Sequence, residues 1–337
     1  MPSQPVVFSG IQPSGAPHLG NYLGAIRPWV REQARSRNYF CIVDLHALTV
    51  ARDPAQLAAQ TRELAAVYWA SGIDSQHSTV FVQSHVPAHT ELGWLLTCLT
   101  PMGWLERMTQ FKEKSGGQQA ERVGAGLFTY PALMAADILL YQTDLVPVGE
   151  DQRQHLELAR DLAQRFNHHY GDTFVVPNPR IGHLGAGSRV MALDDPTAKM
   201  SKTGGNEAGC VLILDPPDLV RRKVLRAQTD SGREVTVATA GPGVANLVDI
   251  WRAATDASME EAARAFDGCG YGQLKARVAE ALVEALAPVQ ARVAELLRDP
   301  GELDRRLGAG AQTARPIAAA TLGTVCSRLG LLPPRGD

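Results

Sequence analysis

Short apolar runs alternate with longer segments of helical periodicity along the first part of the chain. Runs rich in β-branched residues and bounded by turn residues predict buried strands at residues 6–11, 39–48, 78–86 and 144–149. Residues 54–73 carry apolar side chains at helical spacing, start at Pro54 and stop at Gly72, which predicts a helix. This alternation favours an α/β fold with a parallel sheet covered by helices, and it places ligands at the carboxyl ends of the strands.

The pattern changes after about residue 203, where no further succession of strand-like runs follows. Long segments rich in alanine and leucine follow instead, and the apolar stripe along residues 273–299 predicts a helix. Pro288 is expected to kink or interrupt that helix. We therefore expect an α/β domain at residues 1–207, a helical domain at residues 208–300, and a C-terminal helical segment at residues 301–337 that can pack back on the first domain.

Composition narrows the class of protein without fixing its activity. The 337 residues are 45% hydrophobic and 20% charged with a formal charge of -2, which is typical of a soluble globular protein of two domains. A basic face can lie on a neutral protein, so this balance neither requires nor excludes a nucleic-acid partner. The five cysteines lie far apart without a C-x-x-C pair, which predicts neither a disulfide framework nor a zinc site. No leader pattern and no membrane-length apolar stretch is evident, so we expect a cytoplasmic protein without a membrane partner.

The first predicted strand runs into a turn rich in glycine and proline, "SGIQPSGAPHLGNYLGAI" at residues 9–26. If a helix begins near His18, its backbone N–H groups and positive end face the crevice above the sheet, where anions bind. His18 and Asn21 share one face of the first turn, and Gly20 leaves space for a ligand to approach the backbone. His18 could donate to a phosphate oxygen without a permanent charge. A helix cap beside an ordinary surface histidine is the alternative interpretation.

A second candidate segment is "TAKMSKTGGN" at residues 197–206, where Lys199 and Lys202 flank Met200 and Ser201. Two ammonium groups at this spacing can face one polyphosphate, and the glycines that follow would let the loop close over it. Two lysines on a loop are more often part of a solvated surface. The lysine pair and the histidine corner together favour a shared phosphate ligand.

A single carboxylate stands in the apolar segment "LMAADILL", where it belongs to Asp137. Burying a charged carboxylate is costly unless it finds a partner, so Asp137 is a functional candidate. A structural salt bridge or a helix cap would satisfy it as well. The acidic pair Glu150 and Asp151 follows the fourth predicted strand and has two interpretations, a ligand contact in the crevice or an acidic start of a helix.

The segments "HLGN" at residues 18–21 and "KMSKT" at residues 199–203 resemble the two signatures of class I aminoacyl-tRNA synthetases. Similarity to the tryptophanyl-tRNA synthetase family covers nearly the whole chain, and it includes "CIVDLHALTV" (41–50), "RMTQFKEKS" (107–115) and "YPALMAADILLYQTDLVPVGEDQRQH" (130–155). The chain departs from the usual family pattern at several positions, among them "GGN" at residues 204–206, where acidic residues are frequent. His18 replaces a frequent threonine, Leu45 a frequent glutamine, and Thr203 a frequent serine.

The resemblance implies a fold, an activity and partners. The implied fold is a Rossmann-like doubly wound parallel sheet with an all-helical C-terminal domain that binds the anticodon. The implied activity is that of a tryptophan–tRNA ligase, which uses ATP with phosphate-bound Mg²⁺ to form tryptophanyl-adenylate and then charges the 3′ end of tRNA(Trp). A homodimer is implied as well, and no metal site on the protein itself.

The resemblance also assigns roles on the phosphate side of the site. It implies that Lys199 and Lys202 follow the leaving pyrophosphate, that His18 holds the triphosphate, and that Lys114 is a weaker phosphate contact. The full set of residues that it implies for ATP binding is Gln12, Pro13, Ser14, Gly20, Asn21, Gly149, Glu150, Asp151, Val190, Lys199, Met200, Ser201, Lys202 and Thr203.

For the amino acid, the resemblance makes Asp137 the acceptor for the indole N–H group. A selective pocket for indole needs an apolar lining and one acceptor, because indole is a large apolar body with a single donor. The other residues implied to bind tryptophan are Phe8, His46, Tyr130, Met134, Val146, Val148 and Gln152.

Other function classes stay open on the residues alone. A different nucleotidyltransferase could share the phosphate corner, although it would not need the long helical C-terminal part. A regulatory protein without activity is a further alternative, against which the intact His18, Lys199 and Lys202 argue. A basic cluster on a predicted helix suits either contacts with tRNA phosphates or a solvated surface, and it comprises Arg221, Arg222, Lys223 and Arg226.

Overall fold

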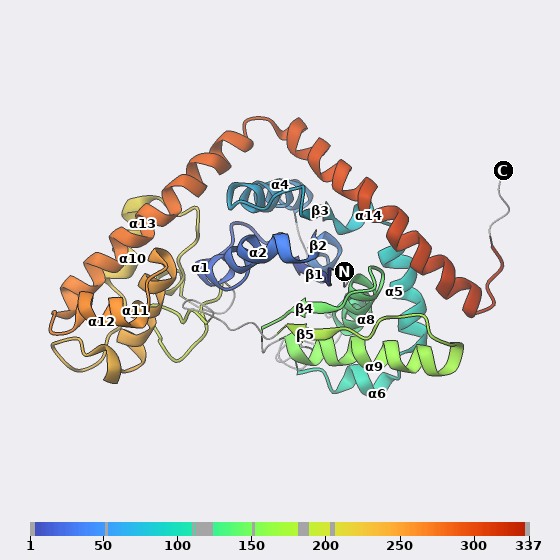
Figure 1. The fold of residues 1–337 in the computed structure, drawn as a ribbon, viewed down its shortest axis with the longest axis horizontal. Coiled ribbons are helices and arrows are strands. Elements are labelled where there is room, and N and C mark those ends of the chain that lie inside the picture. Colours follow the sequence, from blue (N-terminus) through green and yellow to red (C-terminus); the bar gives the residue numbers. More distant parts are fainter. Residues whose placement is uncertain are drawn as a thin grey trace.

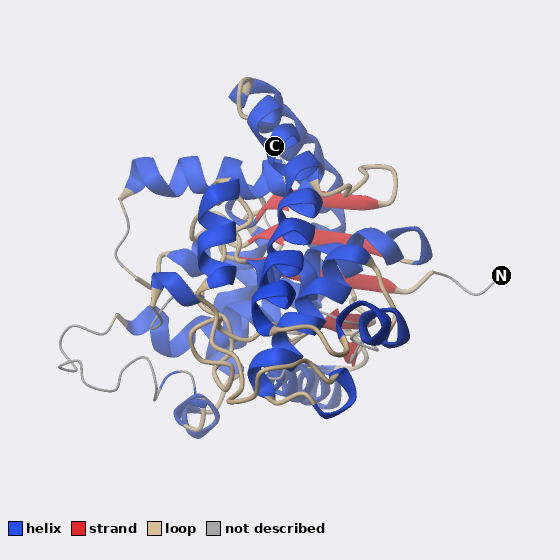
Figure 2. Ribbon diagram, turned by 90° about the vertical axis from the view of Figure 1, so that its left-hand side faces the viewer, coloured by secondary structure: helices blue, strands red, loops and turns tan. Residues whose placement is uncertain are grey.

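A parallel sheet forms the centre of the computed structural model, which describes residues 4–50, 53–109, 111, 124–149, 152–180, 189–202 and 206–333. Within these residues the sheet has five strands in the order β3-β2-β1-β4-β5, and every neighbouring pair is parallel (Figure 2). The strands are β1 (Val6–Ile11), β2 (Arg37–Ile42), β3 (Ser78–Val82), β4 (Leu145–Pro147) and β5 (Asn178–Arg180). This order reverses direction between β1 and β4, which confirms the expected Rossmann-like doubly wound fold.

Helices cover both faces of the sheet (Figure 1). Those of the N-terminal part are α1 (Leu19–Asn21), α2 (Arg27–Glu32), α3 (Asp44–Ala47), α4 (Pro54–Ala70), α5 (Ala88–Leu99), α6 (Met102–Glu106), α8 (Ala125–Leu139) and α9 (Arg153–Tyr170). Those of the C-terminal part are α10 (Pro217–Leu225), α11 (Pro242–Thr255), α12 (Met259–Phe266), α13 (Tyr271–Leu296) and α14 (Pro300–Arg328). Short 3-10 turns lie at residues Gln33–Arg35, Gln83–His85, Glu207–Gly209 and Val237–Thr239, and a π-helical turn at Tyr22–Ile26 joins α1 to α2.

Two apolar clusters lie on opposite faces of the sheet. In β2, Phe40 and Ile42 pack with α1, α2 and α4, whereas Tyr39 and Cys41 pack with α5, α8, α9 and α14. Successive strand residues point to opposite faces, so a strand that is covered on both faces must be apolar throughout. This explains why the strand reads as a continuous apolar run in the sequence.

The C-terminal part of the chain is helical, as expected. No strand follows Arg180 in the described residues up to position 333. Helices α13 and α14 form an arch over α4 (Figure 1), and α14 also packs on β3 and α5. Helix α13 continues through Pro288, so this proline does not end it. The domain boundaries near residues 207 and 300 stay predictions.

Three features of the sheet differ from the sequence-based expectation. The runs at 39–48 and 78–86 were expected to be strands throughout, but β2 ends at Ile42 and β3 at Val82. Beyond the ends of β2 and β3, hydrogen bonds to side chains take the place of the backbone bonds between the strands. Asp44 accepts hydrogen bonds from Ser84, and the Leu45 N–H donates to Gln83. The edge strand β5 was not expected, since it has three residues and contains proline.

In the described residues, no helix combines the length and the apolar character that crossing a membrane requires. All five cysteines are free thiols.

Gly310 lies where α14 crosses β3, and only glycine fits there. A Cβ atom at this position would lie 1.8 Å from the Val80 carbonyl oxygen. We expect Gly310→Ala to lower the thermal unfolding midpoint, because α14 must move off the sheet at a cost of about 1–3 kcal/mol. Gly308→Ala and Gly323→Ala are matched controls on the same helix, where the added methyl group meets no atom within 4 Å. Both controls should keep or raise the midpoint, since alanine favours a helix by about 1 kcal/mol over glycine. A midpoint in Gly310→Ala equal to that of the controls would contradict this packing.

Candidate active site

A cavity of about 390 Å³ opens at the carboxyl ends of β1 and β4, where the strand order reverses. Doubly wound folds bind their ligands in this crevice. The cavity is lined by fourteen of the residues singled out in the sequence: Phe8, Gln12, His18, Gly20, Asn21, His46, Tyr130, Met134, Asp137, Val146, Val148, Gly149, Gln152 and Lys199. Residues that come from five separate parts of the sequence therefore meet in one place.

The remaining candidates fall into two groups. The first is described but does not line this cavity, and consists of Pro13, Ser14, Val190, Met200, Ser201 and Lys202. The second lies outside the described residues, and consists of Lys114, Glu150, Asp151 and Thr203.

The histidine corner follows β1 and starts the first helical segment. His18 has extended backbone angles, and its carbonyl oxygen accepts hydrogen bonds from the N–H groups of Asn21 and Tyr22. Glycine at position 20 also leaves space for the His18 side chain, because a Cβ atom there would lie 3.0 Å from the His18 imidazole. The His18 ring therefore lies against the backbone of Gly20 at the N-terminus of α1.

Burial and two cations keep His18 neutral. Burial and the charges of Lys202 and Lys199 together lower the pKa of His18 from 6.5 to about 4. A neutral imidazole has one donor and one acceptor nitrogen, so His18 can donate to an anionic oxygen at neutral pH.

The lysine segment lies against the same corner. The ammonium group of Lys202 donates to three successive carbonyl oxygens, those of Ser14 at 2.9 Å, Gly15 at 3.2 Å and Ala16 at 2.9 Å. Lys199 lines the cavity. Met200 is buried in the apolar core, so it anchors the segment and is not a lining residue. The two basic groups therefore lie on the same side of the cavity as His18.

At the other end of the cavity, Asp137 on α8 is buried and strongly hydrogen-bonded. Three described side chains donate to its carboxylate: His46 Nε2 at 2.7 Å, Gln83 Nε2 at 2.7 Å and His89 Nδ1 at 2.6 Å. Burial alone would raise the pKa of Asp137, but His46 and His89 outweigh it and lower the pKa from 3.8 to about 2. The carboxylate is therefore ionised at neutral pH.

The charge of Asp137 fixes the protons on its neighbours. An ionised carboxylate only accepts, so the facing nitrogens of His46 and His89 must both carry hydrogen. The other ring nitrogen of His89 lies 2.8 Å from the Tyr141 hydroxyl. A carboxylate has about four acceptor positions, so three protein donors leave capacity for one more donor from the cavity.

Sequence reasoning missed Gln83, His89 and Tyr141. Gln83 and His89 are fully buried polar residues, but they follow an apolar run and look like its continuation or like an ordinary loop. The signal that could have found them is the cost of burying Asp137, which demands donors from elsewhere in the chain.

Apolar side chains surround the path to Asp137. Phe8, Met134, Val146 and Val148 line the cavity, with Tyr130 and Gln152 among its polar lining residues. The Tyr130 hydroxyl lies 2.7 Å from His155 Nε2, and burial raises the pKa of Tyr130 to about 12, so the hydroxyl keeps its proton.

The basic cluster on α10 is partly committed to the fold. Lys223 is buried and pairs with Asp215 at 2.7 Å. Arg221 pairs with Glu280 of α13 at 2.8 Å and with Asp218. Half of the cluster therefore stabilises the helical part of the chain.

Comparison with known proteins decides the family. The family model described as class I tRNA synthetases (W and Y) matches residues 2–287. This chain belongs to that family. A tryptophan–tRNA ligase of Wolinella succinogenes is 51% identical over 326 residues, which cover 97% of this chain and 98% of the relative.

Solved structures of this synthetase family agree over the full length. The crystal structure of tryptophanyl-tRNA synthetase from Mycoplasma pneumoniae has a TM-score of 0.89 at 34% identity and covers 98% of each chain. The synthetase from Campylobacter jejuni, complexed with ADP and tryptophan, has a TM-score of 0.82 at 35% identity, with coverage of 97% of this chain and all of the other. The chain is therefore an aminoacyl-tRNA synthetase with the fold of its tryptophan-specific relatives.

The electrostatics of this synthetase's histidine corner can be tested by titration. We expect the ring protons of His18 to titrate with a midpoint near 4 in NMR spectra, with His18→Asn identifying the signal. Folding lowers the pKa from 6.5, so protonation favours the unfolded chain and the native state loses stability as the pH falls from 6.5 towards 4. A midpoint at or above 6.5 would show that His18 is solvated and not held beside the lysines.

Proposed function

We propose that this chain activates L-tryptophan with MgATP and transfers it to the 3′ end of tRNA(Trp). The observation that carries the proposal is the ionised, buried carboxylate of Asp137, with capacity for one further donor inside an apolar pocket. The same cavity leads to the corner of His18 and Lys199. Relatives with about half of their residues identical carry the name tryptophan–tRNA ligase, which supports the same assignment.

The reaction depends more on positioning the two substrates than on covalent catalysis by the protein. The tryptophan carboxylate attacks the α-phosphorus of ATP, a new carboxyl–phosphate bond forms, and the bond to the β-phosphate oxygen breaks to release pyrophosphate. A ribose hydroxyl of the tRNA then attacks the activated carbonyl and AMP leaves. The protein must hold two anions together and offset the charge that builds on pyrophosphate.

The phosphate side of the cavity supplies groups of the required kind. We infer that His18 donates to the triphosphate, and that Lys199 and Lys202 neutralise the leaving pyrophosphate. Lys202 would have to exchange the carbonyl oxygens of residues 14–16 for phosphate oxygens. The roles of Pro13, Ser14, Lys114, Glu150, Asp151, Val190, Ser201 and Thr203 in ATP binding stay predictions, and Mg²⁺ would arrive bound to the phosphates.

The amino-acid side of the cavity explains a choice of tryptophan. We infer that the indole N–H donates to Asp137 while Phe8, Met134, Val146 and Val148 enclose the ring. Phenylalanine would leave that acceptor unpaired, and sites of this kind reject such ligands by roughly 10⁴–10⁵. We infer that Tyr130 and Gln152, which also line the cavity, meet the amino group of the substrate.

The proposal is tested by ATP–pyrophosphate exchange with each amino acid in turn. We expect exchange with tryptophan and none with phenylalanine. Exchange that depends on a different acid would favour another nucleotidyltransferase, and no exchange at all would favour a binding protein.

The role of Asp137 is tested with Asp137→Asn, which keeps a carbonyl oxygen for Gln83 and His89 but removes the charge. We expect the KM for tryptophan to rise about 10- to 100-fold, the value of a hydrogen bond to a charged group, with the KM for ATP within about twofold of wild type. Asp144→Asn is the control, since Asp144 accepts from the Val6 N–H at the opposite end of the sheet. An unchanged KM for tryptophan in Asp137→Asn rejects the assignment.

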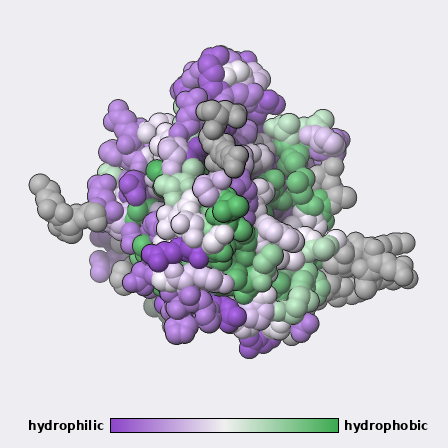
Figure 3. Space-filling view, turned by 90° about the vertical axis from the view of Figure 1, so that its right-hand side faces the viewer, coloured by the Kyte–Doolittle hydropathy of each residue, from purple (hydrophilic) through white to green (hydrophobic). Residues whose placement is uncertain are grey.

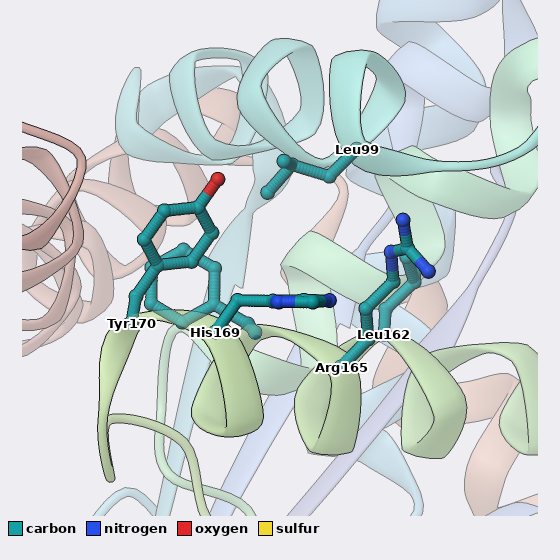
Figure 4. Close-up of a pocket in the computed structure, with 6 residues that line it drawn as sticks. Leu99, Leu162, Arg165, His169 and Tyr170 are labelled. Atoms are coloured by element: carbon teal, nitrogen blue, oxygen red, sulfur yellow. The ribbon is translucent and has the colours of Figure 1, made fainter.

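We infer that two copies of the chain pair through the outer face of α5 and α6. Trp94 on α5 is 68% exposed and Met102 on α6 is 62% exposed, and aromatic residues and methionine are enriched in protein–protein interfaces. A band of apolar residues runs across this face below the end of α14 (Figure 3). The end of α5 also forms one wall of a hollow of about 330 Å³, in which Leu99 faces Arg165 and His169 of α9 (Figure 4).

Light scattering tests the pairing. We expect the wild-type chain to have the mass of a dimer and Trp94→Glu that of a monomer, because a buried, unpaired carboxylate opposes association. Leu225→Glu is the control, an exposed apolar position on α10 at the other side of the molecule. A monomeric wild type at micromolar concentration would end the inference. A location in the cytoplasm stays a prediction.

A further inference from the structure

We propose that Gln290 and Asn246, two residues of the helical part, are positioning residues for the phosphate side of the active site. Gln290 on α13 acts on His18, and Asn246 on α11 acts on Lys199. Neither side chain lines the cavity. The inference rests on the proposed function, because it assigns these residues to the handling of ATP.

The first link joins the histidine corner to residues 210–215, here called the strap. The strap pairs with the corner as an antiparallel bridge between Leu212 and His18. The Leu19 N–H donates to the Val211 carbonyl at 2.8 Å, and the Ile213 N–H donates to the Pro17 carbonyl at 3.0 Å. These two bonds enclose His18 on both sides, so its backbone follows any movement of the strap.

The strap is held from the helical part. Gln290 Nε2 donates to the carbonyl oxygens of Ile213 at 2.8 Å and Asp215 at 3.0 Å. Lys223 on α10 donates to the Cys210 carbonyl at 2.8 Å and pairs with the Asp215 carboxylate at 2.7 Å. Both ends of the strap are therefore tied to α10 and α13 through polar bonds that are largely shielded from water.

The second link joins the lysine segment to α11. Asn246 is buried, and its amide binds Met191 in both directions: the Met191 N–H donates to Oδ1 at 2.9 Å, and Nδ2 donates to the Met191 carbonyl at 3.1 Å. Met191 in turn forms an antiparallel bridge with Lys199, flanked by the bond from the Met200 N–H to the Val190 carbonyl at 3.0 Å. The Asn246 amide therefore holds Met191, the residue that pairs with Lys199.

Both phosphate-side groups thus reach the helical part by the same kind of route, a backbone bridge held by a side-chain amide, which is partly buried in Gln290 and buried in Asn246. Hydrogen bonds to phosphate oxygens depend steeply on distance, so a displacement of about 0.5–1 Å weakens them. The tryptophan side is supported differently, because Phe8 and Val146 belong to the apolar cluster on the opposite face of the sheet, which in the described residues includes side chains of α14 but none of α10–α13. Loss of either amide should therefore affect ATP and spare tryptophan.

The test compares Gln290→Ala and Asn246→Ala with wild type in tryptophan-dependent ATP–pyrophosphate exchange. We expect each variant to raise the KM for ATP, or to lower kcat at saturating ATP, by about three- to tenfold, the effect of losing one or two hydrogen bonds. The KM for tryptophan should stay within about twofold in the same measurements. Asn246→Asp keeps the acceptor for the Met191 N–H and should lie between wild type and Asn246→Ala.

Glu280→Gln is the matched control. Glu280 joins α13 to α10 through Arg221, as the strap contacts do, but this ion pair is exposed and touches neither the strap nor Met191. The control should leave both KM values unchanged, which separates a specific effect from general loosening of the helices.

A second experiment places Gln290→Ala in the His18→Ala background. If Gln290 acts through His18, the further change should be less than about twofold, whereas independent effects would multiply. Equal rises in both KM values, a fall in the unfolding midpoint with unchanged kinetics, or multiplying effects would overturn the inference. Failure of wild type to exchange with tryptophan would instead reject the proposed function, so the two failures are distinguishable.

Discussion

Backbone hydrogen bonds between residues 17–19 and residues 211–213 close the phosphate side of the cavity. The histidine corner follows a strand that ends at Ile11, and its turn has no sheet partner of its own. Without the strap, the Leu19 N–H and the Pro17 carbonyl on either side of His18 would lose their partners beside an apolar core, which is costly. The pairing satisfies those groups, fixes where the first helix starts, and joins the N-terminal α/β part to the segment that leads into the helical part.

The two halves of the cavity rest on different cores. Leu19, Val190 and Met200 belong to the cluster that also contains α4 and the helical part of the chain. Phe8 and Val146 belong to the cluster with α5, α8, α9 and α14. The sheet separates the two clusters, and α14 contributes to both, with Leu303 and Leu307 in the first and its residues from Ala311 onward in the second. The phosphate half therefore packs with α10, α11 and α13 of the helical part, whereas the tryptophan half packs with α14.

The sequence predicted those parts of the site that depend on particular types of side chain. Asp137 was identified because a carboxylate buried in an apolar helix needs hydrogen-bond partners. The structure supplies three side-chain donors for it. The lysine pair and His18 stood out by residue type and spacing, and they lie together as expected. Gln83 and His89 were missed because a buried polar residue looks like a loop residue until its partner is known. The strap was missed because backbone bonds can be made by any residue. Lys114 and Thr203 were named from resemblance, Glu150 and Asp151 also from their place after a strand, and all four lie outside the described residues and stay predictions.

The network around Asp137 shows how a buried charge can serve selection. Desolvation disfavours the ionised carboxylate, and His46 and His89 offset it, so the charge persists although water is excluded. The three protein donors come from separate elements and do not change with the ligand. Only the contribution from the cavity varies between ligands. A ligand with a donor at that point completes the set, and one without it leaves an ionised oxygen short of a partner in an apolar pocket. The proposed role of Asp137 in choosing an N–H donor therefore rests on how completely the protein satisfies the rest of the carboxylate.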